Sequence, residues 1–284
     1  MPLISINCYL EVARSGDFAV PLFDAIDSTS VDGMLAAAEE KYAPLIIGLY
    51  SGTLAQANAP ALIAYIRARA QASTMPVSLM LDHGSSLEQC RQAVDFGFSD
   101  VMFDGSRLSL EENIAQTRAV VDMAHPLGVG VEAELGHVGS GGEYQQYGAQ
   151  RKGFTDPEAV ERFVAETGAD FLAIAIGNAH GVYQGEPCLD FDLLAQIRTR
   201  VRQPLVLHGG SGSSEAQFRS AITGGIAKIN VVTDLYKSAG QQIRAMIVES
   251  PERTSYFDLQ RAGVEAFTQQ CGYYLELFGA AGKG

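Results

Sequence analysis

The chain of 284 residues carries a net charge of −13, and 47% of its residues are hydrophobic. This negative charge argues against nucleic acid or an anionic membrane as a partner, and no apolar run approaches the roughly 20 residues that cross a bilayer. The N-terminal stretch lacks the basic start and long apolar core of a signal peptide. The four cysteines are scattered without CxxC spacing, which argues against a disulfide framework or a cysteine zinc cluster. We therefore expect a reduced, cytoplasmic protein.

Eight short apolar or β-branched runs recur along the chain and alternate with helix-like segments. In chain order these predicted strands are 18–23, 43–50, 77–83, 100–105, 128–135, 171–177, 204–210 and 226–232. The alternation predicts parallel strands joined by right-handed crossovers. It favours an α/β fold, a (β/α)8 TIM barrel in a single domain over residues 1–284, with extra C-terminal helices after about residue 233. An open, doubly wound sheet is the alternative, because a count of strands does not prove closure.

Capping boxes predict where three of the helices begin. Each pairs a hydroxyl residue with a glutamate three positions later, which together satisfy the first free N–H groups of a helix. The patterns are Ser85-x-x-Glu88, Ser109-x-x-Glu112 and Thr155-x-x-Glu158.

Polar residues gather where the predicted strands end. In a barrel of this kind the chemistry lies at the C-terminal ends of the strands, so different strands would deliver carboxylates and imidazoles to one rim. The residues at these ends are Asp82, His83, Asp104, His180, His208 and Asn230.

Three of the five histidines occupy such strand ends. Three imidazoles with an open fourth position make a catalytic Zn²⁺ site, and His83, His180 and His208 are the predicted ligands. The alternative is that each is an ordinary histidine bonded to backbone. His125, close to a predicted helix end, is interpreted as structural, and His137 as a partner of the metal ligands.

Two glutamates lie within the fifth predicted strand. Glu132 and Glu134 are two residues apart, so they point to the same side and face the barrel interior. Either they pair with Lys228, or one approaches the metal or a second cation site; the residues alone favour neither. Asp104 joins them as a candidate for that second site or for a group that holds the metal ligands.

The loops after the seventh and eighth strands are candidates for binding phosphate. This is the usual phosphate site of such barrels, where glycines let the backbone approach and helix N-termini offer N–H donors. The candidate residues are Gly181, Gly209, Gly210, Ser211, Asn230, Val231, Val232 and Thr233. Whether Na⁺ or K⁺ also binds there stays open.

Seven motifs run in order through residues 81–235, namely LDHG, VMFDGS, ENIAQT, VEAELG, AIGNAHGVY, PLVLHGGSG and KINVVTDL. Together they resemble class II (zinc-dependent) ketose-bisphosphate aldolases of the fructose- and tagatose-bisphosphate type. The resemblance implies a lyase that cleaves a phosphorylated ketose into dihydroxyacetone phosphate and an aldehyde through a metal-stabilised enediolate. It also implies a homodimer or homotetramer.

The resemblance assigns roles to individual residues. Asp82 would be the acid/base for the proton on the C4 oxygen, beside the zinc ligands. The 209–212 turn, including Gly212, would help to hold dihydroxyacetone phosphate. In the loop GSGGEYQQYG, Glu143 matches a glutamate implicated in proton transfer at the α carbon, but Tyr144 stands where the family has Asp.

The far end of the substrate is where the chain departs from the family. The stretch FDAID places Asp24 where an amide is common, and Val264 aligns with the arginine that binds a second phosphate. Arg261 lies one turn away. We place Asp24 and Ser51 at this end and predict a ketose 1-phosphate rather than a simple bisphosphate; a fructose- or tagatose-1,6-bisphosphate aldolase proper is the alternative.

Three other functions compete with this one. Lys228 on the eighth strand could form a Schiff base, although an interior ion pair is favoured. A non-catalytic aldolase-like partner subunit would be expected to have lost Asp82 or the histidines, which this chain retains. A zinc hydrolase on the same barrel would need an HxH pair after strand one, where FDAID stands instead.

Overall fold

The computed structural model describes residues 3–141, 153–183, 187–252 and 254–284. Its strands are β1 (Val20–Asp24), β2 (Leu45–Tyr50), β3 (Val77–Gly84), β4 (Asp100–Phe103), β5 (Gly130–Leu135), β6 (Gly139–Ser140), β7 (Phe171–Ile174), β8 (Ala179–His180), β9 (Leu205–Leu207) and β10 (Ile226–Asn230). Its helices are α1 (Asn7–Ser15), α2 (Ser28–Lys41), α3 (Ser51–Leu54), α4 (Ala59–Ala72), α5 (Leu87–Asp95), α6 (Leu110–Ala124), the 3₁₀ turn η1 (His125–Leu127), α8 (Pro157–Thr167), α9 (Phe191–Arg200), α10 (Glu215–Thr223), α11 (Thr233–Glu249) and α12 (Tyr256–Leu277).

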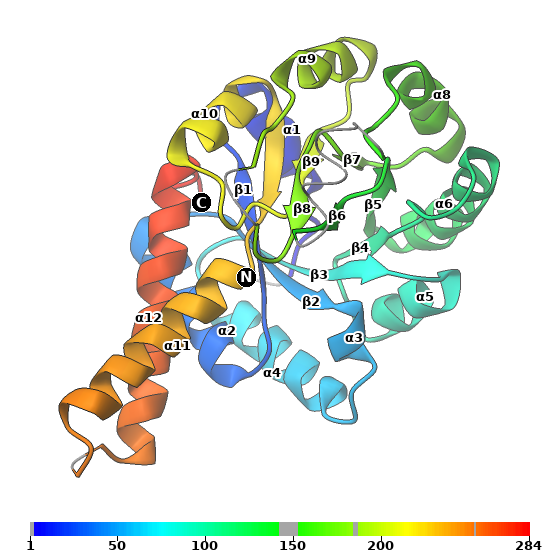
Figure 1. Cartoon of the computed structure of the whole chain (residues 1–284). Helices are drawn as coiled ribbons and strands as arrows, with labels where there is room; N and C mark the ends of the chain where they lie inside the picture. Colours follow the sequence, from blue (N-terminus) through cyan, green and yellow to red (C-terminus); the bar gives the residue numbers. More distant parts are fainter. Residues whose placement is uncertain (1–2, 142–152, 184–186, 253) are drawn as a thin grey trace.

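Eight of the strands close into a parallel barrel in the order β1-β10-β9-β7-β5-β4-β3-β2. The helices lie outside this ring (Figure 1). The predicted TIM barrel is therefore confirmed, and the open sheet is wrong because β1 pairs with β10. In a ring of eight, each strand faces the fourth strand along, so β3 lies opposite β9 and β4 lies opposite β10.

Burial on both faces explains the composition of the barrel strands. Parallel strands covered by helices read as continuous apolar runs, and all residues from Val77 to Leu81 are buried. The core fills the barrel and the space between the strands and the helices. Among the described residues, we find no helix with the length and apolarity that a membrane span requires.

Two of the three predicted helix starts are wrong by one residue. The Ser109 capping box is present, but α5 is capped by Ser86 and α8 by Asp156. The side chain of Thr155 is used elsewhere, because its hydroxyl donates to the Leu135 carbonyl at 2.5 Å and accepts the Ala175 N–H at 2.8 Å. Thr155 thus links β5 to the chain after β7.

The predicted C-terminal helices are confirmed as α11 and α12, a hairpin that extends away from the barrel (Figure 1). Helix α12 packs closely on α2, where a Cβ on Gly33 would collide with Phe267. Beyond α12, the N–H of Gly282 donates to the Lys41 carbonyl at 2.9 Å. The C-terminal end of the chain is therefore fixed against the end of α2.

A buried carboxyl group joins the N-terminal segment to the bottom of the barrel. Asp100, at the start of β4, accepts hydrogen bonds from Ser5 Oγ at 2.7 Å, Ile6 N at 3.1 Å, Ser78 Oγ at 2.6 Å and Ser99 Oγ at 3.1 Å. Burial raises the pKa of Asp100 to about 7, although these four donors oppose the rise. An unfolded aspartate titrates near 3.9.

This difference predicts a dependence of stability on pH. Because the folded pKa is the higher one, the stabilising contribution of Asp100 is full below about pH 4 and is lost as the pH rises through about 7. Asp100→Asn removes this titration. Both proteins are unfolded in urea at the same zinc concentration. The difference between their free energies of unfolding, native protein minus Asp100→Asn, should be smaller at pH 8 than at pH 5. A larger difference at pH 8 would show that the four donors stabilise the carboxylate instead.

Candidate active site

The end of β3 brings Asp82 and His83 out of the apolar core. The pairing of β3 with β4 shifts register between Leu81 and Gly84, and His83 has a φ of 53°. Left-handed backbone in a residue other than glycine costs roughly 1–3 kcal/mol, and bulges commonly re-aim side chains beside active sites. The irregularity directs His83 toward the barrel axis.

Three imidazoles meet over the mouth of the barrel. His83 Nε2 lies 3.1 Å from His180 Nε2 and 3.0 Å from His208 Nδ1, and one nitrogen from each ring lies within 4.8 Å of the others. In a tetrahedral zinc site with Zn–N bonds of about 2.0–2.1 Å, ligand nitrogens stand about 3.3 Å apart. The three residues thus fit a metal ion, as the sequence predicts.

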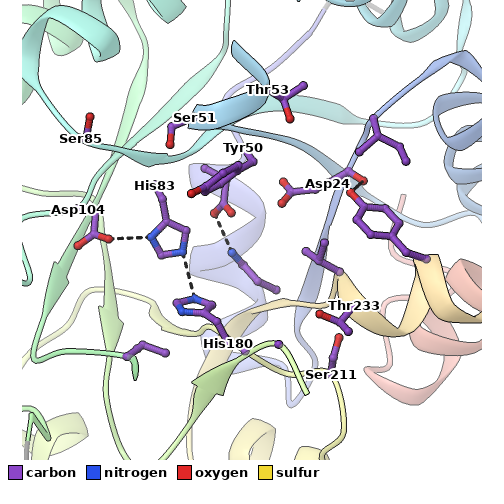
Figure 2. A pocket seen from close by; sticks show the side chains of 18 of the residues that line it. Asp24, Tyr50, Ser51, Thr53, His83, Ser85, Asp104, His180, Ser211 and Thr233 are labelled. Atoms are coloured by element: carbon purple, nitrogen blue, oxygen red, sulfur yellow. Dashed lines mark hydrogen bonds and ion pairs between the residues drawn. The ribbon is translucent and has the colours of Figure 1, made fainter. Parts of the chain in front are cut away.

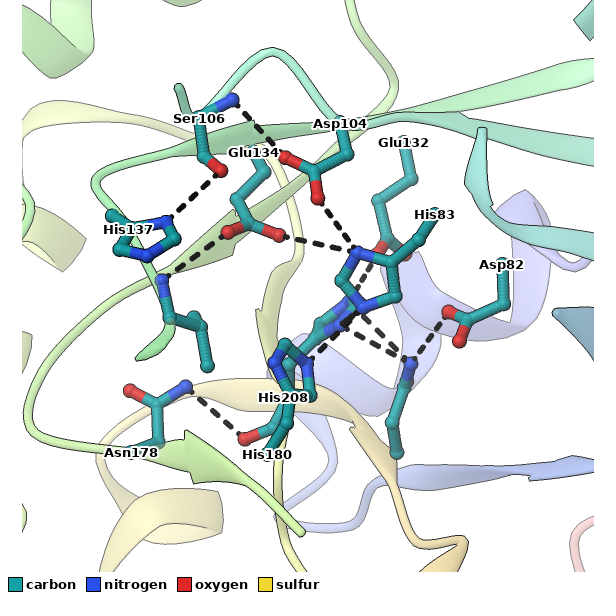
Figure 3. Close-up of polar contacts among 12 residues, drawn as sticks. Asp82, His83, Asp104, Ser106, Glu132, Glu134, His137, Asn178, His180 and His208 are labelled. Carbon is teal, nitrogen blue, oxygen red and sulfur yellow. Dashed lines mark hydrogen bonds and ion pairs between the residues drawn. The ribbon is translucent and has the colours of Figure 1, made fainter. Parts of the chain in front are cut away.

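Carboxylates hold two of these rings in the orientation that a metal needs (Figure 3). His83 Nδ1 lies 2.9 Å from Asp104 Oδ2, which leaves Nε2 for the metal. His208 Nε2 lies 2.7 Å from Glu132 Oε1, which leaves Nδ1. Such partners fix the tautomer and the direction of a ligating histidine.

The charges around His83 favour a cation at this position. Burial disfavours the imidazolium, but the negative charge of Asp82, the hydrogen bond with Asp104 and the charge of Glu134 outweigh it and raise the pKa of His83 to about 10. Positive charge is thus stabilised where the three rings meet.

The other two rings are kept neutral. Burial, followed by the positive charge of His83, lowers the pKa of His180 to about 4 and that of His208 well below its ordinary value. The centre therefore stabilises one positive charge, and neutral imidazole is the form that ligates a metal. A bound divalent ion would take the place of the proton on His83.

A second group of possible ligands shares His83. Its Nδ1 and oxygens of Asp104 and Glu134 lie within 4.8 Å of one another, with Glu134 Oε2 3.9 Å from the ring nitrogen. The two glutamates of β5 thus separate in role, because Glu134 turns toward His83 whereas Glu132 pairs with Lys228. The sequence alone did not distinguish these roles.

Beneath the imidazoles, four buried side chains form a continuous polar chain, which we call the interior relay (Glu132, Lys228, Asn230, Asp82). Lys228 Nζ lies 2.8 Å from Glu132 Oε2 and donates to Asn230 Oδ1 at 2.7 Å. The amide of Asn230 then donates to Asp82 Oδ1 at 3.0 Å. Since Glu132 also contacts His208, the interior relay joins a metal-ligand candidate to the acid/base candidate.

The same contacts argue against a Schiff base. Lys228 is fully buried, its amine contacts Glu132 and Asn230, and it does not line the pocket described below. The predicted interior ion pair is confirmed.

A pocket of about 710 Å³ opens over the imidazoles (Figure 2). Six predicted phosphate-site residues line it, namely Gly181, Gly209, Ser211, Asn230, Val232 and Thr233. Thr233 begins α11, and the first N–H groups of a helix lack intrahelical acceptors. This side of the pocket offers backbone donors to an anion.

Three other predicted phosphate residues do not line the pocket, and their N–H groups are engaged. Gly210 donates to the Asn230 carbonyl at 2.9 Å, and Val231 donates to the Leu22 carbonyl at 3.0 Å. Gly212 donates to Asp234 Oδ2 at 3.0 Å. These three residues therefore shape the loops and do not offer their N–H groups to a ligand.

The other side of the pocket carries hydroxyls and acids. Ser51, Thr53 and Ser85 line it. Asp24, predicted to lie at this end, also lines the pocket, but it ends β1 beside β10, and its carbonyl accepts a hydrogen bond from Tyr236 of α11 at 3.0 Å. Burial, and then the negative charge of Asp82, raise the pKa of Asp24 well above its ordinary value. We did not predict Arg107, although it lies in a loop just after a strand end, the same signal that located Asp104.

The remaining predictions have different outcomes. His125 is structural, since its Nε2 lies 2.9 Å from Asp170 Oδ2. His137 lines the pocket with its Nδ1 3.4 Å from Ser106 Oγ. Glu143 and Tyr144 lie outside the described residues.

Comparison with known proteins decides the family. The family model described as "Fructose-bisphosphate aldolase class-II" matches residues 4–283. The chain belongs to the class II fructose-bisphosphate aldolase family. The aldolase is 37% identical over 293 residues to a Halalkalibacterium halodurans protein named "6-phospho-5-dehydro-2-deoxy-D-gluconate aldolase", with 100% of this chain and 98% of the relative covered.

Two further relatives agree. A "Probable fructose-bisphosphate aldolase" of Bacillus subtilis is 38% identical over 255 residues, which cover 89% of each chain. The crystal structure of the YdjI aldolase from Escherichia coli K12 superposes with a TM-score of 0.88 at 36% identity, covering 99% of both chains. The aldolase is therefore a carbon–carbon lyase.

Proposed function

We propose that the aldolase reversibly cleaves a ketose 1-phosphate into dihydroxyacetone phosphate and an aldehyde, with Zn²⁺ held by His83, His180 and His208. The observation that carries the proposal is the convergence of three imidazoles within 4.8 Å beside Asp82. Bound there, zinc would act as a Lewis acid that polarises the ketone and stabilises developing negative charge.

The protein supplies the proton transfer. In the cleavage direction a base must take the C4 hydroxyl proton, and Asp82 projects into the pocket from the residue before His83. The hydrogen bond from Asn230 fixes one carboxylate oxygen, and the carboxyl group of Asp24 lies beside the Asp82 carboxylate. Glu143, which lies outside the described residues, is proposed as the group that moves the proton at the α carbon.

Backbone groups would hold the phosphate. Gly209, Ser211 and Thr233 lie on the side of the pocket formed after β9 and β10, where the start of α11 favours negative charge. This arrangement would let a protein of charge −13 bind an anion.

The far end of the pocket supports a substrate other than a simple bisphosphate. Neither Val264 nor Arg261 lines the pocket. Arg261 lies 3.6 Å from Asp258 on its own helix. The relatives' names support the ketose-phosphate class without fixing this end, because they mention both a fructose bisphosphate and a phosphogluconate derivative.

We further propose that the enzyme works in the cytoplasm as a homodimer or homotetramer. The four cysteines, all within the described residues, form no disulfide, which suits a reducing compartment. Sedimentation of the purified enzyme would distinguish the two assemblies from a monomer.

The decisive experiment measures release of dihydroxyacetone phosphate from fructose and tagatose 1-phosphates and 1,6-bisphosphates. Each is run as purified, after EDTA, and after zinc is restored. We expect EDTA to abolish cleavage and Zn²⁺ to restore it. Activity unaffected by EDTA would contradict the metal mechanism, and faster turnover of a bisphosphate than of any monophosphate would contradict the proposed substrate.

A further inference from the structure

The pocket has two ends that lie on opposite sides of the barrel. The proposed phosphate residues follow β9 and β10, whereas Ser51 follows β2 and Ser85 follows β3. Figure 2 shows Ser211 and Thr233 on one side of His180, with Ser51 and Ser85 on the other. A ketose held by its 1-phosphate at β10 and by its carbonyl at the imidazoles therefore extends toward the loops after β3 and β4.

Arg107 stands at this far end, on a turn that is tied to the metal site. The N–H of Leu108 donates to the Gly105 carbonyl at 3.0 Å, which closes a β-turn with Arg107 at its third position. Asp104 holds the turn through Oδ1, which accepts the Ser106 N–H at 3.1 Å. Its Oδ2 lies 2.9 Å from His83 Nδ1. One carboxylate thus fixes both the turn and the metal-ligand candidate.

Arg107 is the single lysine or arginine among the described residues that line the pocket. Apart from the histidines, the other charged residues of the lining are acidic, namely Asp24, Asp82 and Asp104. Within the described ranges, the guanidinium of Arg107 makes no ion pair of 4 Å or less, and the side chain is exposed at the rim. The fold therefore leaves a cation available at the far end of an otherwise acidic pocket.

We propose that Arg107 binds a carboxylate at the end of the substrate remote from the phosphate, so that the enzyme cleaves a phosphorylated keto sugar acid. This inference rests on the proposed aldolase reaction and names its substrate class. The planar guanidinium matches a carboxylate through two parallel hydrogen bonds. Ser51, Thr53 and Ser85 provide hydroxyl partners for the carbons between the carbonyl and the acid.

A second phosphate fits this end less well than a carboxylate. A phosphate dianion would meet one cation, Arg107, on a turn held by the acidic Asp104, whereas the single charge of a carboxylate is neutralised by Arg107. The nearby helix starts offer no compensation, because α5 has Glu88 and α6 has Glu111 and Glu112 in the first turn. At the phosphate end, α11 also has Asp234 in its first turn, but the glycine turn at Gly209 lets the backbone approach an anion there.

The test compares three substrates that differ only at C6. They are fructose 1-phosphate, its C6 carboxylate analogue and fructose 1,6-bisphosphate, with the tagatose series run in parallel. In the native zinc enzyme, kcat/KM for the carboxylate should exceed that for the hydroxymethyl compound by about tenfold or more, the range of a charge-assisted hydrogen-bond pair. In Arg107→Gln this ratio should fall to about 1–3. Arg91→Gln, an exposed arginine on α5 outside the pocket lining, should keep the native ratio.

Each outcome has a clear meaning. Equal turnover of the carboxylate and hydroxymethyl compounds, or preference for the bisphosphate, would overturn the role of Arg107 and leave the aldolase reaction standing. A carboxylate preference that survives Arg107→Gln would also overturn it. Failure to cleave any member of either series would overturn both this inference and the proposed function.

Discussion

Asp82→Asn is expected to lower kcat about 10²- to 10⁴-fold, the contribution of a well-placed general base. An amide cannot take the proton from the C4 hydroxyl. The variant should otherwise keep the site intact, because the carbonyl of the new asparagine can still accept the hydrogen bond that Asn230 donates at 3.0 Å. The measurements are single-turnover cleavage and zinc content by atomic absorption.

Zinc content separates this loss from a collapse of the site. Asp82 does not belong to the triad of His83, His180 and His208, so the variant should bind zinc at the native ratio. Asp122→Asn, an exposed aspartate on α6, is the matched control and should retain native kcat. An Asp82→Asn enzyme that binds zinc and turns over within threefold of the native rate would exclude Asp82 as the base.

Lys228→Met should be the most destabilising of these changes. Removing one partner of a buried ion pair leaves an uncompensated charge and costs about 3–5 kcal/mol in the free energy of unfolding. Here the charge left without its partner is that of Glu132, which is fully buried. Urea unfolding measures the effect. Lys41→Met, which breaks the partly exposed pair with Glu276, should cost about 1 kcal/mol or less.

The double variant Glu132→Gln/Lys228→Met separates stability from function. It removes both charges, so most of the lost stability should return. Activity should not return, because Asn230 lacks the amine that sets its orientation and His208 lacks a carboxylate partner. Recovery of kcat in the double variant would show that the interior relay serves stability alone.

Borohydride reduction with substrate should leave Lys228 of the native enzyme unlabelled.

Strand ends could be located from sequence because burial and catalysis impose opposite demands on adjacent residues. A strand covered on both faces must be apolar, as from Val77 to Leu81, so the sudden change at Asp82 marks where it meets solvent. Repeated on several strands, this change predicts both the barrel and the converging histidines. The seven ordered motifs then pointed to the aldolase family, and the comparisons confirm it.

Features that depend on tertiary contacts could not be predicted in this way. Glu132 and Glu134 share a face, but which of them reaches Lys228 depends on the stagger of the barrel strands. Thr155 looks like a helix cap and instead links β5 to the chain after β7. Gly210 and Val231 look like anion donors, yet their N–H groups are used by neighbouring strands and loops. Local pattern does not identify partners that are distant in sequence.

The pairing of β1 with β10 has a consequence for how the chain folds. Val20 pairs with Lys228, so the ring closes between segments that are separated by most of the chain. Until the last strand is synthesised, β1 exposes an unpaired edge, and such edges promote association with other chains. The histidine cluster also needs β9 in place, since His208 follows it directly. Zinc uptake during synthesis would therefore report the placement of β9, just before β10 closes the barrel. Slow translation would prolong the interval in which the nascent chain needs protection from aggregation.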